Sequence, residues 1–191
     1  MAWDTDRTRE RLLAAGVRQF AKHGFAGARI DAIGADAGVN KERVYRYFGN
    51  KEGLFQAVLA SQLAGLLDGL AAHGSGPAAV GTLAGAMFDR CEAQPDLPRL
   101  LAWESLELDH AVGIDARRPV CAGVAASIGS ATGSDHEAAT QALLSIIVVV
   151  VSWTTLPRLT DAVAPGTSGA ARRAAVVAHA TAIGTSLTLD A

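Results

Sequence analysis

The sequence has few of the residues that stabilise secreted or sheet-rich proteins. Cys91 and Cys121 are its two cysteines, and they form neither a CxxC pair nor a disulfide framework, which favours a reducing compartment. Aromatic residues make up 5% of the chain, while half of it is apolar, with alanine, leucine and glycine dominant. This composition favours helices that pack through small side chains over strands built from β-branched residues. We therefore expect an all-α fold.

The first residues, MAWDTDRTRERLL, lack the apolar stretch of a signal peptide, so we expect a cytoplasmic protein. Residues 138–156 carry no charged side chain, and this uncharged segment is long enough to span a membrane. However, Gln141 and Ser145 interrupt this segment and no Lys/Arg cluster flanks it. Ser134 and Glu137 also form the S-x-x-E pattern that caps a helix. We expect no membrane partner, and a helix buried on nearly all sides, at the protein centre or in a subunit interface.

Motifs of common enzymes are also missing. The sequence contains no HExxH, no GxSxG and no phosphate-binding glycine loop, and its histidines and cysteines lack the close pairs of zinc sites. Residues 103–110, WESLELDH, gather acids and a histidine and are the strongest candidate for acid–base chemistry. Because no recognised constellation surrounds them, we expect no enzyme, no metal site and no cofactor.

Charge is divided unevenly along the chain, although its net value is −2. Residues 1–56 carry ten Lys/Arg against seven Asp/Glu, a balance of +3, and the remainder carries seven against twelve, a balance of −5. A basic amino-terminal module joined to an acidic body is consistent with nucleic-acid binding. The alternative is a chance surplus on an ordinary surface.

Hydrophobic periodicity and capping residues predict helices throughout the chain. The amino-terminal ones are expected at 5–23, with a stop near Gly24; at 30–37, with a stop at Gly38; after the cap Asn40; and after Asn50, reaching about Ala72. After the break HGSGP at 73–77, helices are expected at about 78–93, 97–111, 115–129, 135–156 and 168–188. Pro119 leaves open whether the third of these is one helix or two.

The two short helices on either side of Gly38 have the layout of a helix-turn-helix. In the second of them, Val44 and Phe48 are spaced to face inward, which leaves Lys, Arg and Tyr side chains around the exposed side. The major groove is about 12 Å wide and admits one such helix. Arginine suits guanine, while lysine and tyrosine hydroxyls suit phosphates. Residues 40–47 are therefore predicted to contact DNA.

This region resembles the DNA-binding domain of the TetR family of transcriptional regulators. The family's pattern F...G, an Ile-containing helix, AGV, Y.YF and K..L is matched by Phe20...Gly24, Ile30–Ile33, Ala37–Val39, Tyr45–Phe48 and Lys51–Leu54. The resemblance covers about a third of the chain. It implies a DNA-binding domain at 5–65, joined by a linking helix to a helical effector-binding and dimerisation domain at 75–189. The implied function is ligand-responsive transcriptional regulation, more specifically repression.

Carried over by position, the resemblance implies that Tyr47 and Lys51 contact phosphates, and that Lys41, Glu42, Arg43 and Tyr45 approach base edges. Arg46 suits either role, and Glu42 either accepts from cytosine or pairs with Arg46. The full predicted set is Arg29, Asn40, Lys41, Glu42, Arg43, Tyr45, Arg46, Tyr47 and Lys51.

The sequence departs from the family at positions 28 and 29, where Ala28 and Arg29 replace the usual Thr or Ser. The hydroxyl that would cap the second helix is lost, at a cost of about 0.5–2 kcal/mol. Arg29 either replaces the phosphate contact by its charge or is simply solvated.

One short reading helix contacts too few bases to select a genomic site, so a homodimer on a palindromic double-stranded operator is expected. The resemblance implies that the last two helices, about 135–156 and 168–188, form the interface. These helices are poor in charge. The alternative is that they form an intramolecular core.

The resemblance also implies an unknown small-molecule effector that releases the protein from DNA by changing the separation of the two reading helices. Side chains of the middle helices are candidates to line its pocket: Met87, Phe88, Cys91, Trp103, Glu104, Glu107, His110 and Trp153. If Glu104 and Glu107 face inward without a partner, they favour a cationic ligand. Arg90 or Arg99 are alternative partners for these carboxylates.

Overall fold

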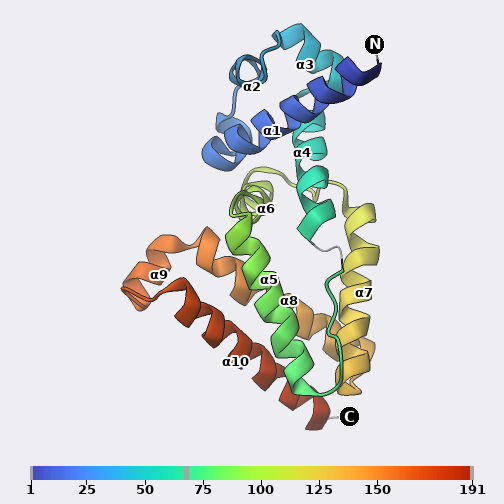
Figure 1. Ribbon diagram of the computed structural model, residues 1–191, viewed down its shortest axis with the longest axis vertical. Helices are drawn as coiled ribbons and strands as arrows, with labels where there is room; N and C mark the ends of the chain where they lie inside the picture. Colours follow the sequence, from blue (N-terminus) through green and yellow to red (C-terminus); the bar gives the residue numbers. More distant parts are fainter. Residues whose placement is uncertain (1, 67–68, 190–191) are drawn as a thin grey trace. The chain divides into compact units, whose positions relative to one another are not determined.

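The computed structural model describes residues 2–66 and 69–189 (Figure 1). Within these residues every regular element is a helix, which confirms the predicted all-α fold. The chain divides into two compact units: Met1–Gly65 with Asp96–Ile114, and Leu66–Pro95 with Asp115–Ala191. Each unit is described by itself below.

The first unit contains the four amino-terminal helices and one helix from the middle of the chain. They are α1 (Ala2–Gly27), α2 (Ile30–Ala37), α3 (Lys41–Phe48), α4 (Lys51–Leu66) and α6 (Asp96–Glu107). The core between α1 and α4 is aromatic: the Phe20 and Phe55 rings meet edge to face with centroids 5.1 Å apart, and both side chains are fully buried. Burial of each ring stabilises the unit by about 1.5–3 kcal/mol.

The helix α6 packs against the carboxyl-terminal part of α1. The Trp103 indole donates a hydrogen bond to the Ala21 carbonyl at 3.3 Å, and Glu107 accepts one from the Ala26 amide at 2.8 Å. Gly24 has φ of 74°, and a Cβ there would lie 2.8 Å from the Glu107 carboxylate. A glycine therefore both ends the regular part of α1, as predicted, and admits α6.

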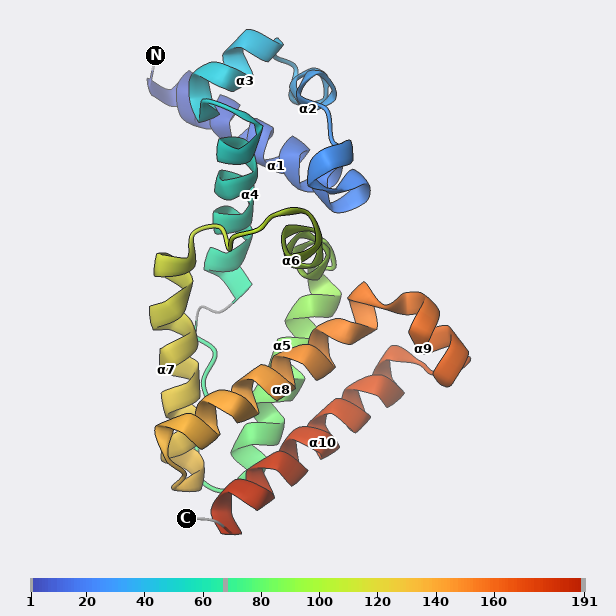
Figure 2. The same cartoon turned by 180° about the vertical axis from the view of Figure 1, so that it is seen from behind.

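The second unit is built on α5. Its helices are α5 (Pro77–Ala93), α7 (Ile114–Thr132), α8 (His136–Thr155), α9 (Pro157–Val163) and α10 (Gly169–Leu189). In both views α8 and α10 lie on one side of α5 (Figures 1 and 2), and α5 packs most extensively against α10. Gly85 permits this close approach, since a Cβ there would lie 3.0 Å from the Val177 side chain. A bidentate pair, Asp89 with Arg173 at 2.6 and 2.8 Å, joins the same two helices.

Two predicted helix ends are wrong. The fourth helix was expected to reach about Ala72, but α4 ends at Leu66, and Gly69 adopts a φ of 67° that breaks helical geometry. Leu70 and Ala72 are buried in a non-helical segment, where the Ala72 amide donates to the Ser127 hydroxyl at 2.9 Å. Leu67, which falls within that expected helix, lies outside the described residues. The α6 helix likewise ends at Glu107 rather than near residue 111.

Three local predictions in the second unit also need correction or completion. Asp135, not Ser134, caps α8, because its carboxylate accepts from the Ala138 amide at 2.8 Å. No helix was expected between residues 156 and 168, yet Pro157 occupies the first turn of α9. Pro119 lies inside α7, which is one helix.

Among the described residues, α8 is the one helix long and apolar enough to cross a membrane. Its 18-residue window has a mean hydropathy of 1.7, and 28% of that window is buried. Leu144 and Val148 are each 56% exposed, so the expected burial on nearly all sides is wrong for the single chain. Of the two places expected for this helix, a subunit interface is the one that would cover these side chains.

Candidate nucleic-acid interface

The turn between α2 and α3 has the geometry that the sequence predicts. Gly38 is left-handed, with φ of 68° and ψ of 37°. Its amide donates to the Ala35 carbonyl at 3.1 Å, and the Val39 amide donates to the Gly34 carbonyl at 2.8 Å, a pairing that satisfies the last carbonyls of α2. A Cβ on Gly34 would lie 2.9 Å from the Val39 carbonyl oxygen, so the tight turn needs a glycine there as well.

Two arginines of α1 contact the end of α2 next to this turn. Arg11 donates a hydrogen bond to the Ala37 carbonyl, and Arg18 forms an ion pair with Asp36 at 2.9 Å. The positions of these two arginines in the sequence do not reveal these partners. These two contacts join α1 to the end of α2 and help to hold α2 in position.

The start of α3 is capped by Asn40, whose side chain accepts from the Arg43 amide at 3.0 Å. Val44 is 1% exposed, which confirms its inward position. Phe48 is half-buried, and the Arg9 guanidinium lies 5.8 Å from its ring centroid. These contacts orient the remaining side chains of α3 outward.

The junction of α3 with α4 is tight. The Asn50 side chain accepts from the Gly53 amide at 2.7 Å and so caps α4. A Cβ on Gly53 would collide with the Phe48 carbonyl. Gly53 is therefore the residue that lets α4 begin directly beside the end of α3.

The outward side chains Lys41, Glu42, Tyr45 and Arg46 are exposed, and we call this surface the α3 face. Their spacing places them together on one side of the helix. Lys41 lies 3.5 Å from the Asp31 carboxylate and 5.9 Å from the Tyr45 ring centroid. Within the described residues no ion pair joins Glu42 to Arg46, and the role of Glu42 toward cytosine stays a prediction.

Five members of the predicted DNA-contacting set lie outside the α3 face: Asn40, which caps the helix, Arg29, Arg43, Tyr47 and Lys51. Arg43 is half-buried on the same helix. The Tyr47 hydroxyl donates to the Thr5 carbonyl at 3.4 Å. Lys51 donates to the Ala26 carbonyl at 3.0 Å, and its ammonium lies 5.1 Å from the Phe25 ring centroid.

Burial lowers the pKa of Lys51, and the charge of Glu107 opposes that shift. An ammonium group has three donors, so one bond to Ala26 leaves two for a phosphate. The phosphate roles of Tyr47 and Lys51 stay predictions.

Arg29 precedes α2 in an extended conformation, with φ of −115° and ψ of 129°, and makes no capping hydrogen bond. This confirms the loss of the hydroxyl cap. Its side chain is exposed, which is compatible with both alternatives for its role.

The predicted ligand-binding residues are divided between the two units. Trp103, Glu104, Glu107 and His110 belong to the first, and Met87, Phe88, Cys91 and Trp153 belong to the second. Glu104 accepts from the Val112 amide at 2.6 Å and Glu107 from Ala26, so both carboxylates have partners within their unit. Burial raises the pKa of the Cys91 thiol to about 11. Trp153 lines a groove at the end of α8.

Two family models match the chain. The amino-terminal one is described as "Bacterial regulatory proteins, tetR family" and covers residues 12–58, which include α2, α3 and the turn between them. The other is described as "Tetracyclin repressor-like, C-terminal domain" and covers residues 80–181. The second match alone spans more than half of the chain.

Named proteins resemble the chain over different lengths. The HTH-type transcriptional repressor SCO4008 of Streptomyces coelicolor is 40% identical over 106 residues, 56% of this chain and 54% of that protein. The HTH-type transcriptional repressor NicS of Pseudomonas putida is 48% identical over 58 residues, 30% and 27% of the two chains. The chain thus spans about half or less of these curated relatives. The crystal structure of the S. coelicolor regulator SCO4942 superposes with a TM-score of 0.73 at 33% identity, covering 92% and 97% of the two chains.

Proposed function

Because the chain belongs to the TetR family, we propose that it is a cytoplasmic, DNA-binding transcriptional repressor that acts as a homodimer on a palindromic operator. Members of this family bind DNA, act as dimers and are not enzymes. The observation that carries the proposal is the α3 face, which is exposed and cationic and is presented by a capped helix behind a tight turn. Repression is supported by the repressors among the relatives.

On this proposal α3 enters the major groove. Arg43 and Arg46 are suited to guanine edges, and Tyr45 to a base edge or a thymine methyl group. The backbone amides at the start of α3, which Asn40 caps, and the Lys41 ammonium are suited to contact the phosphate backbone. Tyr47, Lys51 and Arg29 supply further backbone contacts that fix the register of the helix.

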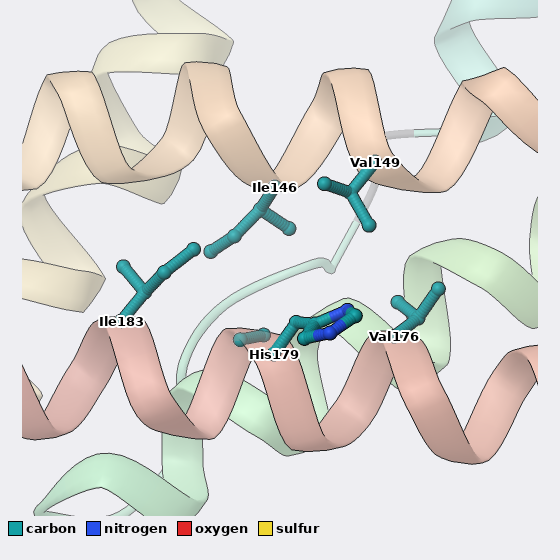
Figure 3. Close-up of a pocket in the computed structure, with 6 residues that line it drawn as sticks. Ile146, Val149, Val176, His179 and Ile183 are labelled. Carbon is teal, nitrogen blue, oxygen red and sulfur yellow. The ribbon is translucent and has the colours of Figure 1, made fainter.

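The proposed dimer interface is formed by α8 and α10. The exposed Leu144 and Val148 of α8 give it an apolar centre. Figure 3 shows Ile146 and Val149 of α8 facing Val176, His179 and Ile183 of α10 across a cavity of about 10 Å³. A cavity of that size holds at most one water, so it is a packing gap rather than an effector site.

The effector is proposed to be a small molecule that binds one conformation of the dimer better than the other. DNA affinity then falls by the difference between those two binding free energies. The helix α6 is part of the same unit as α3 and bonds to α1 through Trp103 and Glu107.

The experiment that tests the proposal is selection of bound fragments from genomic DNA with the purified protein. We expect a palindrome whose half-sites are separated by about 34–36 Å or a multiple of it. Arg43→Ala should relax the preference at one base of each half-site, by about 1–3 kcal/mol of discrimination. Arg118→Ala, which removes an exposed cation of α7, is the matched control and should leave the selected sequence unchanged. Enrichment of no sequence by the wild-type protein would contradict the proposal.

A further inference from the structure

A groove opens in the second unit where α8, α9 and α10 meet, and we call it the α9 groove. Its volume is about 360 Å³. Small-molecule sites usually measure about 300–1,000 Å³. The gap between α8 and α10 in Figure 3, at about 10 Å³, is far below that range. The α9 groove is therefore large enough for a small organic ligand.

The walls of the α9 groove are mostly apolar. Trp153 comes from α8, Leu156 lies between α8 and α9, and Leu159 and Val163 come from α9. Leu156, Leu159 and Val163 are 49%, 57% and 76% exposed. Apolar side chains gathered at one place on a surface are typical of a site that binds something apolar.

One cation lies in this apolar wall. Arg172 of α10 donates from Nη2 to the Val149 carbonyl at 2.9 Å and to the Ser152 hydroxyl at 3.3 Å. A guanidinium group has five donors, and both bonds come from Nη2, so Nε and Nη1 bond to none of the described residues and remain for a ligand. In the described part of the chain no carboxylate lies within ion-pair distance of Arg172. The adjacent Arg173, by contrast, is neutralised by Asp89.

We propose that the α9 groove binds a small amphipathic carboxylate. The ligand carboxylate accepts from the remaining donors of the Arg172 guanidinium, on Nη1 or Nε, and its hydrocarbon body packs against Trp153, Leu159 and Val163. Arginine and carboxylate are opposite in charge, and a charge-assisted hydrogen bond between them selects an anion over a neutral or cationic ligand. The first turn of α10 contains no acidic residue that would oppose this charge. The inference goes beyond the proposed regulator, since it requires neither DNA nor an operator.

Titration of the full-length protein with octanoate and 4-phenylbutyrate tests the proposal, with calorimetry and tryptophan fluorescence as readouts. Both probes are expected to bind saturably, one per chain. Octanamide, 4-phenylbutyramide and octylamine keep the hydrocarbon but not the negative charge, and they should bind at least about tenfold more weakly, since a charge-assisted hydrogen bond contributes about 1.5–3 kcal/mol. Trp153→Phe should remove the fluorescence change, because Trp153 lines the groove.

Arg172→Gln should weaken octanoate binding at least about tenfold. Arg158→Gln removes an exposed cation from α9 that does not line the groove, and it should change nothing. Because Arg172 also supports the α8 carbonyl, a second variant guards against misfolding: Val163→Asp, at a 76% exposed position, should keep the wild-type melting temperature and repel the carboxylate.

The proposal is wrong if the neutral amides bind as tightly as the acids, if Arg158→Gln causes the same loss, or if the wild-type protein binds neither acid saturably. It is equally wrong if Val163→Asp splits a dimer while no carboxylate binds, because a second copy then covers the groove. A protein that binds octanoate but no DNA duplex would contradict only the proposed regulatory function.

Discussion

At some single positions of the first unit the backbone conformation requires glycine. Gly38 ends α2 in the left-handed region, and the Arg11 guanidinium lies where a Cβ would be. A non-glycine residue in this region costs about 1–2 kcal/mol, so Gly38→Ala should lower the free energy of unfolding by at least that amount. Gly123→Ala is the control: this helical glycine of α7 has open space around it, and alanine should stabilise it by about 0.5–1 kcal/mol. Urea denaturation of the two variants checks both signs.

His110 gives the first unit a pH-dependent contribution. It lies 2.8 Å from Asp109 and 3.2 Å from Glu52, and the hydrogen bond to Asp109, followed by that to Glu52, raises the pKa of its imidazole. A raised folded-state pKa stabilises the fold below the unfolded value of about 6.5, and the contribution disappears as pH rises through the folded value. The difference in melting temperature between the wild type and His110→Gln should be largest near pH 5.5 and vanish at alkaline pH. A difference that grows with pH would refute this assignment.

At the scale of elements, the contact between α1 and α6 depends on two hydrogen bonds. Glu107→Ala would remove the acceptor of the exposed Ala26 amide, and because water can replace it, the expected cost is the net value of one hydrogen bond, about 0.5–1.5 kcal/mol. The expected result is faster hydrogen exchange at Ala26 and a lower melting temperature. Ser105→Ala, at an exposed position on the same helix, is the control and should leave exchange at Ala26 as in the wild type.

Local signals in the sequence predict well where α2 ends and where α3 and α4 begin. The caps Asn40 and Asn50 and the stop Gly38 act through neighbouring backbone groups, so their positions determine helix ends directly. The errors occur where two local signals compete. Ser134 and Asp135 are both good caps, and Pro157 suits a first helical turn as well as a break. The apolar pattern also continues past Leu66, which hides the stop at Gly69.

Contacts between distant parts of the chain were beyond prediction from periodicity. The sequence shows Trp103 and Glu107 as pocket candidates, whereas the structure gives them hydrogen bonds to α1. Periodicity likewise does not reveal the partners of Arg11 and Arg18. In the structure Arg11 bonds to the Ala37 carbonyl and Arg18 pairs with Asp36. Arg172 in the α9 groove was not singled out either, because its lack of a carboxylate partner is a property of the fold.

At the scale of the whole molecule, the exposed apolar side chains of α8 would be covered by the proposed dimer interface of α8 and α10. Val148→Asp places a charge at the centre of the proposed interface, on a side chain that is 56% exposed in the single chain. We expect it to weaken dimerisation at least tenfold without unfolding the protein, because a buried charge without a partner costs several kcal/mol. Leu106→Asp makes a similar change at a 76% exposed position of α6 and should remain dimeric. Sedimentation velocity distinguishes these outcomes, and a dimeric Val148→Asp would place the interface elsewhere.

The central claim is that α3 lies in duplex DNA while neighbouring cations hold the phosphates, and the salt dependence of operator affinity tests it most directly. We expect the logarithm of the association constant, measured by fluorescence anisotropy, to fall linearly with the logarithm of salt concentration. Lys51→Ala removes one phosphate contact from each protomer, so its slope should be shallower by about 2 units. An operator affinity that does not change with salt concentration would contradict this claim. The same holds if Lys51→Ala leaves the slope of the salt dependence unchanged.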